Sequence, residues 1–481
     1  MPNLPLSQPD GEHRITIPWL QNVAATQRSP APRPIGREIL GVSSAAALHS
    51  PTSMSTPLDP PPSHRVNFVR AFLASALGTG LSRVLGAARD VVIAGLLGAS
   101  ASSDAFWIAF TIPNVFRRFV ADEGLTGAMI PALAQARAEE GPEAVRRLAA
   151  STFGALVVAN LVLCLVGILA AEPLVLAFAW SWRDDPEQLQ MATTMTRWMF
   201  PFVAMVSTVS FFEGLLNFRG HFFVPKIAPG LVSAGMVAGA LSLSTRLEEP
   251  AFSLVIGVLA GGLVHVLVNL VPLWRLWGRV GLALRMTPRL RALLSEMSKV
   301  LAIGVFAQIN LLVLRQLATS LPEGAVTHYV NGTRIVDLAQ GMVAVAIGSA
   351  LLPNLSASVA EASWGRFRSD LTGALRLAAF LLLPIAVVVY VWAEPAAALL
   401  FRHGRYSWED TLVTASAVRY LVPFLLAVAA VNILKRVFFA LEDRTTLLVV
   451  GGMGVALTGV IGTLLVSAHG VAGLSLALSV A

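Results

Sequence analysis

Arginine side chains recur inside the long apolar stretches of this chain. Arg83 and Arg89 lie in the first stretch, Arg117 and Arg118 end the second, and Arg334 lies in a later one. A charge inside a membrane is costly unless it faces a water-filled cavity or a partner. Arg83 and Arg89 are separated by about 9 Å along a helix and point to different faces, so at least one should face an aqueous interior. Guanidinium groups stay charged and bind phosphate oxygens through paired hydrogen bonds, so this excess of arginine predicts an anionic, phosphate-bearing ligand.

The acidic and edge residues near these arginines admit two interpretations. Asp90 can neutralise the arginine that precedes it, and Asp104 opens the second stretch. Arg117, Arg118 and Glu123 lie near an expected membrane edge, where ordinary interfacial anchoring is the alternative to ligand binding. Acidic residues inside the apolar stretches are too few to pair with every arginine there. This imbalance favours a ligand over purely structural ion pairs.

Several classes of enzyme and binding protein find no support in the sequence. The lysines are Lys226, Lys299 and Lys435, and none belongs to a phosphate-binding loop of the P-loop type. The sequence contains no H-E-x-x-H motif and no G-x-S-x-G motif. Cys164 is the single cysteine, which excludes an intramolecular disulfide. The net charge of +7 does not indicate nucleic acid, because the basic residues gather in short loops between apolar segments.

The composition is that of a helical membrane protein. Hydrophobic residues make up 55% of the chain and charged residues only 13%, against about 25% in soluble proteins. Stretches such as 149–171 and 252–273 carry little or no charge and are long enough to cross a bilayer as helices. They do not alternate as the strands of a β-barrel would.

The distribution of basic residues predicts the topology. Loops after odd-numbered spans carry only Arg183, Arg246, Arg402 and Arg405. Loops after even-numbered spans, together with the span ends next to them, carry many more arginines and all of the lysines. The positive-inside rule then places the N-terminus in the cytoplasm. We predict twelve spans, at residues 68–97, 101–119, 148–172, 193–217, 222–244, 251–276, 298–321, 325–352, 372–394, 412–438, 445–467 and from 469 onward.

Three regions follow from this pattern. Residues 1–66 are rich in Pro, Ser and Ala and are expected to form a disordered cytoplasmic tail, unless Met54 is the true start. Residues 67–280 are predicted to form an N-terminal lobe of six helices, and residues 281–481 a C-terminal lobe of six.

The two predicted lobes resemble each other and differ at their ends. The segment around Pro131, after the second span, resembles the segment around Pro353, after the eighth. This similarity favours a parallel repeat, with a symmetry axis along the membrane normal. The twelfth span starts near Val471 and has about 11 residues, too few to cross, so we expect the sequence to be a shortened form of a longer protein.

The segment of residues 78–90 (GTGLSRVLGAARD) resembles the opening helix of the MurJ/MviN family. The similarity continues through residues 103–106 (SDAF), 112–118 (IPNVFRR) and 123–124 (EG). Weaker similarity reaches residues 438–441 (FFAL), so that the resemblance covers residues 67–481.

The resemblance implies a lipid II flippase of the MOP exporter superfamily, an all-α polytopic membrane protein with two six-helix lobes around a cationic cavity. The ligand would be undecaprenyl diphosphate linked to a disaccharide peptide, in the bacterial inner membrane. Membrane lipids and cell-wall synthesis proteins are the other partners implied, with no enzymatic activity, cofactor or metal. Alternating access would be driven by a coupling cation or by the membrane potential. The substrate-binding residues implied are Arg83, Arg89, Arg117, Arg118, Arg334, Asp104 and Glu123.

The chain departs from the family pattern in its second half. Family members usually have Asp-Arg where this chain has Thr333-Arg334 and Leu314-Arg315, and a proline at the position of Ala339. These departures leave alternatives open. One is a related flippase for polysaccharide lipids, or a multidrug exporter, in which acidic residues rather than arginines would be expected. Another is a scaffold for cell-wall assembly that transports nothing.

Overall fold

The computed structural model describes residues 68–118, 126–441 and 443–481, and every regular element in these ranges is a helix. All of these residues belong to one compact unit, Leu58–Ala481. The predicted disordered tail and Glu123 lie outside the described residues.

In the described part of the first half, six helices make up most of the predicted spans, and further elements connect them. The six helices are α2 (Phe68–Leu97), α3 (Ala101–Arg117), α5 (Pro142–Leu169), α7 (Pro186–Phe218), α9 (Gly230–Leu243) and α10 (Ala251–Trp277). The connecting elements are α4 (Thr126–Glu140), α6 (Ala171–Phe178), η2 (Trp180–Asp184) and α8 (Phe223–Ile227).

The second half begins with α11, and the boundary predicted at residue 280 lies in the segment between α10 and α11. Its helices are α11 (Pro288–Thr319), α12 (Ala325–Ala360), α13 (Trp364–Val391), α14 (Ala393–Phe401), α15 (Trp408–Ala440) and α16 (Arg444–Val480). Gly470 interrupts α16 with a φ of 58°, which only glycine adopts readily. The interruption lies at the boundary predicted between the eleventh and twelfth spans.

Helices of the first half pack closely because small residues meet at their contacts. Helix α9 lies along α10, α10 along α7, and α7 along α3, while α2 lies along α9. A methyl group added to Gly235 would lie 2.5 Å from the carbonyl oxygen of Gly257. Glycine at both positions therefore lets the α9 and α10 backbones approach, as membrane helices without a hydrophobic driving force require. Phe106 and Phe200 are fully buried in the core that these helices enclose.

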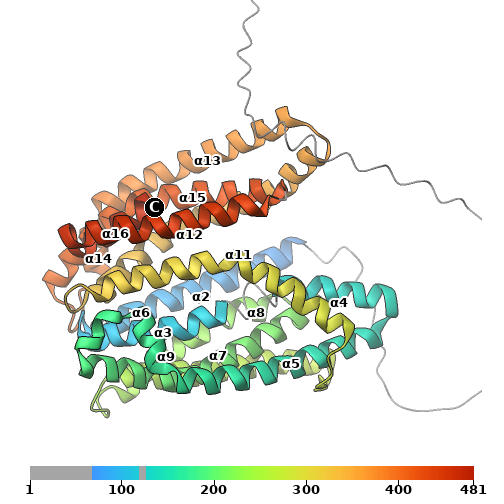
Figure 1. Ribbon diagram of the computed structural model, residues 1–481, viewed down its shortest axis with the longest axis horizontal. Coiled ribbons are helices and arrows are strands. Elements are labelled where there is room, and N and C mark those ends of the chain that lie inside the picture. Colours follow the sequence, from blue (N-terminus) through green and yellow to red (C-terminus); the bar gives the residue numbers. More distant parts are fainter. Residues whose placement is uncertain (1–67, 119–125, 442) are drawn as a thin grey trace, which may run out of the picture. The chain divides into compact units, whose positions relative to one another are not determined.

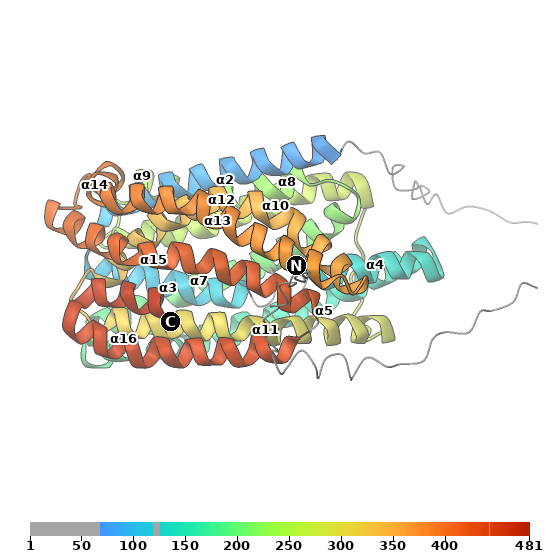
Figure 2. The ribbon, with the colours of Figure 1, turned by 90° about the horizontal axis from the view of Figure 1, so that it is seen from above.

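In the second half, α15 runs beside α12, α13 and α16, and α11 runs beside α16. Figures 1 and 2 show α13, α15 and α16 with their axes roughly aligned, and α11 lies next to α16. Helices α3 and α12 are in contact, so the two halves meet there.

The outer surface of these helices suits a lipid environment. Large apolar side chains remain exposed along α5 (Leu161, Leu165) and along α13 (Phe380, Val387). Among the described residues, six helices are long and apolar enough to cross a membrane by length and composition. They are Pro142–Leu169, Pro186–Phe218, Ala251–Trp277, Trp364–Val391, Trp408–Ala440 and Thr445–Val480. The prediction of an all-α polytopic membrane protein is confirmed.

Candidate functional site

A central cavity of about 460 Å³ lies where the two halves face each other. Helices α2, α3, α7, α9, α10, α11 and α12 all contribute to its wall. Two acidic side chains, Glu213 and Asp337, also line it. Its cationic residues are Arg89, Arg117, Arg118, Arg315 and Arg334.

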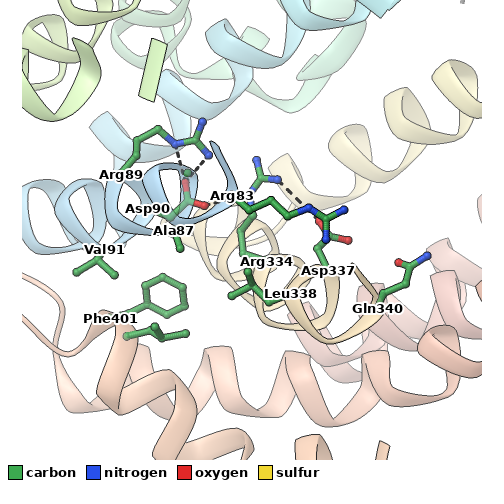
Figure 3. Close-up of a pocket in the computed structure, with 12 residues that line it drawn as sticks. Arg83, Ala87, Arg89, Asp90, Val91, Arg334, Asp337, Leu338, Gln340 and Phe401 are labelled. Atoms are coloured by element: carbon green, nitrogen blue, oxygen red, sulfur yellow. Dashed lines mark hydrogen bonds and ion pairs between the residues drawn. The ribbon is translucent and has the colours of Figure 1, made fainter. Parts of the chain in front are cut away.

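A second cavity, of about 430 Å³, adjoins the first on the side of α2 and α12. It shares Arg89, Arg334 and Asp337 with the central cavity and adds Arg83 and Gln340. Figure 3 shows these side chains projecting from α2 and α12 toward a common space. Arg83 is exposed and lies in this second cavity, whereas Arg89 belongs to both.

Asp90 connects two of the predicted arginines across the halves. Its Oδ1 lies 2.6 Å from Arg89 Nη2, and its Oδ2 lies 3.3 Å from Arg334 Nε (Figure 3). Asp337 Oδ2 lies 3.8 Å from Arg334 Nη1. The prediction that Asp90 neutralises its neighbour describes only half of this geometry, because the same carboxylate also holds α12 to α2.

Arg117 and Arg118 reach the central cavity from the end of α3. Arg117 Nε donates a hydrogen bond to Asn114 Oδ1 at 3.1 Å, one turn earlier on the helix. The structure therefore places four of the predicted residues around one cavity, namely Arg89, Arg117, Arg118 and Arg334.

Arg315 was not among the predicted binding residues, although it lies inside an apolar span like the others. Its residue surface is 8% exposed, and its guanidinium carbon lies 5.8 Å from the centre of the Tyr329 ring. Within the described part of the chain, its Nε and Nη1 have no hydrogen-bond partner. A buried guanidinium with unused donors is costly, so this group is suited to an anion that enters the cavity.

Asp104 does not belong to the residues that line either cavity. Its Oδ2 accepts from the backbone N–H of Gly324 at 2.9 Å, and its Oδ1 accepts from the N–H and the hydroxyl of Thr327 at 2.8 and 2.6 Å. It thus satisfies free donors at the start of α12, where a carboxylate is also favoured by the helix dipole. These contacts join α3 to α12 within the protein, and the substrate contact predicted for Asp104 stays a prediction.

The start of α3 and the start of α12 form what we call the α3–α12 junction, made by Asp104, Gly324 and Thr327. Ser103 Oγ is 2.7 Å from Thr327 Oγ1, and Glu323 accepts a hydrogen bond from the backbone N–H of Ala101. Asp104 and Arg117, at opposite ends of the same helix, are separated by about 20 Å along its axis.

The sequence interpretation also missed an acidic and an imidazole side chain in the cavity wall. Glu213 of α7 and His265 of α10 lie inside apolar spans and line the central cavity. Their intramembrane position was the signal that could have found them. The described residues contain no group of three or more His, Cys, Asp or Glu placed to hold a metal ion.

The chemistry available to this cavity is anion binding. Several guanidinium groups converge on one space, where a polyanion can contact more than one of them at a time. Their N–H groups match the geometry of phosphate oxygens. When no anion is bound, Asp90 and Asp337 offset part of the positive charge of Arg89 and Arg334.

Comparisons with known proteins agree with this arrangement. The family described as "Lipid II flippase MurJ" matches residues 93–481. The lipid II flippase MurJ of Burkholderia cenocepacia is 31% identical over 386 residues, which are 79% of this chain and 75% of that protein. A probable lipid II flippase MurJ of Bdellovibrio bacteriovorus is 30% identical over 422 residues, 85% of this chain and 79% of its own length.

Solved structures show the same fold. A lipid II flippase MurJ in an inward closed conformation superposes with a TM-score of 0.74 at 20% identity, over 85% of this chain and 84% of that one. An inward-facing multidrug resistance MATE transporter of the MOP superfamily gives 0.70 at 15% identity, over 85% and 94%. These likenesses confirm the predicted transporter fold, which this chain shares with MurJ and the MATE transporter. On the match to residues 93–481 and the identity to its curated members, the chain belongs to the family of the lipid II flippase MurJ.

Proposed function

We propose that this protein moves lipid II from the cytoplasmic to the outer leaflet of the bacterial inner membrane. The observation that carries this proposal is the central cavity, in which five arginines from both halves converge on one space. The diphosphate of lipid II carries the charge and the oxygen geometry that these groups bind best. A cationic drug, the substrate class of many exporters, would be repelled by the same cavity.

The two halves act by alternating access in this proposal. The N-terminus lies in the cytoplasm, so the α3–α12 junction lies at the outer end and the Arg117 end of α3 faces inward. The junction is closed by hydrogen bonds between Asp104 and the start of α12, which supports a resting state that is sealed toward the outside. The headgroup enters from the cytoplasm, occupies the arginines, and leaves after the junction opens.

Energy for the cycle comes from the membrane potential or from a coupling cation. Moving one charge through 100 mV changes the free energy by about 2.3 kcal/mol, and the direction favours an anion leaving a negative interior. The diphosphate is such an anion, which supports transport without nucleotide hydrolysis.

The test is complementation of a strain depleted of its own lipid II flippase. The wild-type chain should restore growth and exposure of lipid II at the outer face. Arg89→Ala should restore neither while inserting at normal levels, and Arg89→Lys should also fail because an ammonium lacks the paired donors. Full rescue by Arg89→Ala at matched protein level would remove the diphosphate contact at this position.

A further inference from the structure

A buried histidine and a glutamate meet in the wall of the central cavity on the side of α7 and α10. His265 Nε2 lies 3.6 Å from Glu213 Oε1. The side chains of His265 and Glu213 are 5% and 21% exposed, and both residues line the cavity. The arginine site described above does not use either group.

The imidazole of His265 is unusual because its polar atoms are unused. Both ring nitrogens are buried, and neither has a hydrogen-bond partner in the part of the chain that the structure describes. A neutral imidazole offers one donor and one acceptor, and leaving both unsatisfied in a buried site is unfavourable. One turn further along α10, Asn269 donates to the carbonyl oxygen of His265 and leaves its own Oδ1 without a partner among the described residues. The ring thus lies in the cavity wall beside the Glu213 carboxylate, with the hydrogen-bonding capacity of both nitrogens unused among the described residues.

A proton is the ligand that this pair accommodates best. Protonation of His265 gives two N–H donors, one of them directed at a carboxylate already 3.6 Å away. The contact then becomes an ion pair inside a poorly solvated wall, where opposite charges attract strongly. One N–H bond forms at Nε2, the proton comes from the solvent buffer through the cavity, and no other bond changes.

Charged groups on several helices face the pair. Helix α9, which packs along α10, carries no charged residue, and Lys226 lies on the short helix α8. Across the cavity the pair faces Arg89 of α2, Arg117 and Arg118 at the end of α3, Arg315 of α11, and Tyr329, Arg334 and Asp337 of α12. The net charge of this opposite wall is positive, so an empty cavity disfavours an additional cation at His265. An anion bound by the arginines reverses that effect.

We propose that Glu213 and His265 form a proton-binding site whose occupancy is linked to that of the arginines. Binding of a diphosphate promotes proton uptake at the pair, and by reciprocity a proton at the pair strengthens anion binding. The identity of the anion rests on the proposed function, whereas the linkage follows from the position of the pair in the cavity wall.

The experiment measures proton uptake and affinity when inorganic pyrophosphate binds to the full purified chain. Titrations in buffers of different ionisation enthalpy give the number of protons taken up between about pH 6 and pH 8, the range in which histidine titrates. His265→Asn and Glu213→Gln are compared with the wild type, so that protonation of pyrophosphate itself cancels in the difference. His221→Asn is the matched control, because His221 is exposed in the turn after α7. Thermal unfolding shows that each variant is folded.

The wild type and His221→Asn should take up more protons per bound pyrophosphate than either pair variant. Their affinity should also rise several-fold more steeply as the pH falls. Equal proton uptake and equal pH dependence in all four proteins would overturn the linked site while leaving the anion site intact. Failure of the wild type to bind pyrophosphate at any pH tested would overturn the proposed function and, with it, the linkage.

Discussion

The α3–α12 junction and the central cavity use buried polar groups in opposite ways. At the α3–α12 junction, Asp104 accepts three hydrogen bonds and Ser103 pairs with Thr327. In the central cavity, Arg315 and His265 keep buried nitrogens without hydrogen-bond partners among the described residues. One region is satisfied by the chain itself, and the other keeps its hydrogen-bonding capacity for something else.

The difference separates charges that hold the protein together from charges that await a ligand. A buried carboxylate at a helix start, fully hydrogen-bonded, is what a structural contact requires. Buried donors without partners destabilise an empty protein, and they persist where binding repays that cost. Position inside an apolar span does not distinguish the two cases, because Asp104 and Arg315 share it.

Thiol labelling tests on which side of the membrane the α3–α12 junction lies, and we expect an all-or-none result. With Cys164 replaced by Ser, a cysteine at Asp185 should react with an impermeant reagent in intact spheroplasts, and a cysteine at Arg366 should not. Both positions are exposed, so a difference in labelling reports the side of the membrane. Labelling at Arg366 alone would place the junction on the cytoplasmic side and invert the direction of the cycle.

Removal of Arg315 should have the next largest effect. Hydrogen bonds to charged groups contribute about 1.5–3 kcal/mol, so Arg315→Ala should weaken anion binding by about 10- to 100-fold. Arg419→Ala is the control, because Arg419 lies 3.4 Å from Glu394 outside the cavity. Exposure of lipid II at the outer face should fall for the first variant only. Equal loss in both variants would indicate a general effect on folding.

Opening of the junction should follow from Asp104→Ala. The change leaves the donors of Gly324 and Thr327 without their acceptor, which costs about 1–3 kcal/mol for buried groups. A cysteine at Ala325, which is 3% exposed, should become reactive from outside in this variant. Glu323→Gln should raise its labelling much less, because that hydrogen bond is exposed. Unchanged protection of the cysteine in Asp104→Ala would show that the junction is held by packing instead.

Much of the fold could be predicted from the sequence, because lipid imposes a strong constraint on composition. The length of the apolar stretches and the basic loops between them predicted the long helices. The break at Gly470 lies at the boundary expected between the eleventh and twelfth spans. The domain limits at residues 66 and 280 stay predictions. Which helices pack side by side could not be predicted, because a single sequence does not give the distances between helices.

The site was predictable in part for the same reason. Arg89 and Arg334 were identified as arginines inside apolar spans, and the structure brings them to one carboxylate, Asp90. The junction role of Asp104 could not be foreseen, because it depends on the start of α12 lying beside α3. Glu213 lines the cavity but was not predicted as a site residue. Glu123 was predicted but lies outside the described residues.

The smallest effect is expected at an exposed ion pair far from both regions. Arg289 lies 2.8 Å from Glu139 and 2.5 Å from Glu140. A hydrogen bond from Gln135, with a second from Arg289, lowers the pKa of Glu139, and Arg289 lowers the pKa of Glu140. A carboxyl group whose pKa is lowered in the folded protein contributes stability at pH values above its ordinary pKa of 4.5. This contribution is lost as the pH falls through the pKa of the folded state.

Arg289→Gln should therefore lower the melting temperature slightly at neutral pH, and less than Asp104→Ala does. The difference from the wild type should shrink when melting is measured below about pH 4.5, where the carboxyls become protonated. Salt should reduce the same difference, because exposed pairs are screened. A difference that grows on acidification would contradict the sign of this contribution.

The central claim is that the arginine cavity holds a lipid diphosphate, and direct binding tests it. Undecaprenyl diphosphate and undecaprenyl monophosphate are titrated into the purified wild type and into the Arg89→Ala Arg315→Ala double variant. We expect the wild type to bind the diphosphate about tenfold or more tightly than the monophosphate, because each charged hydrogen bond lost costs about 1.5–3 kcal/mol. The double variant should lose this preference. Equal affinity of the wild type for both lipids, or an unchanged preference in the double variant, would contradict it.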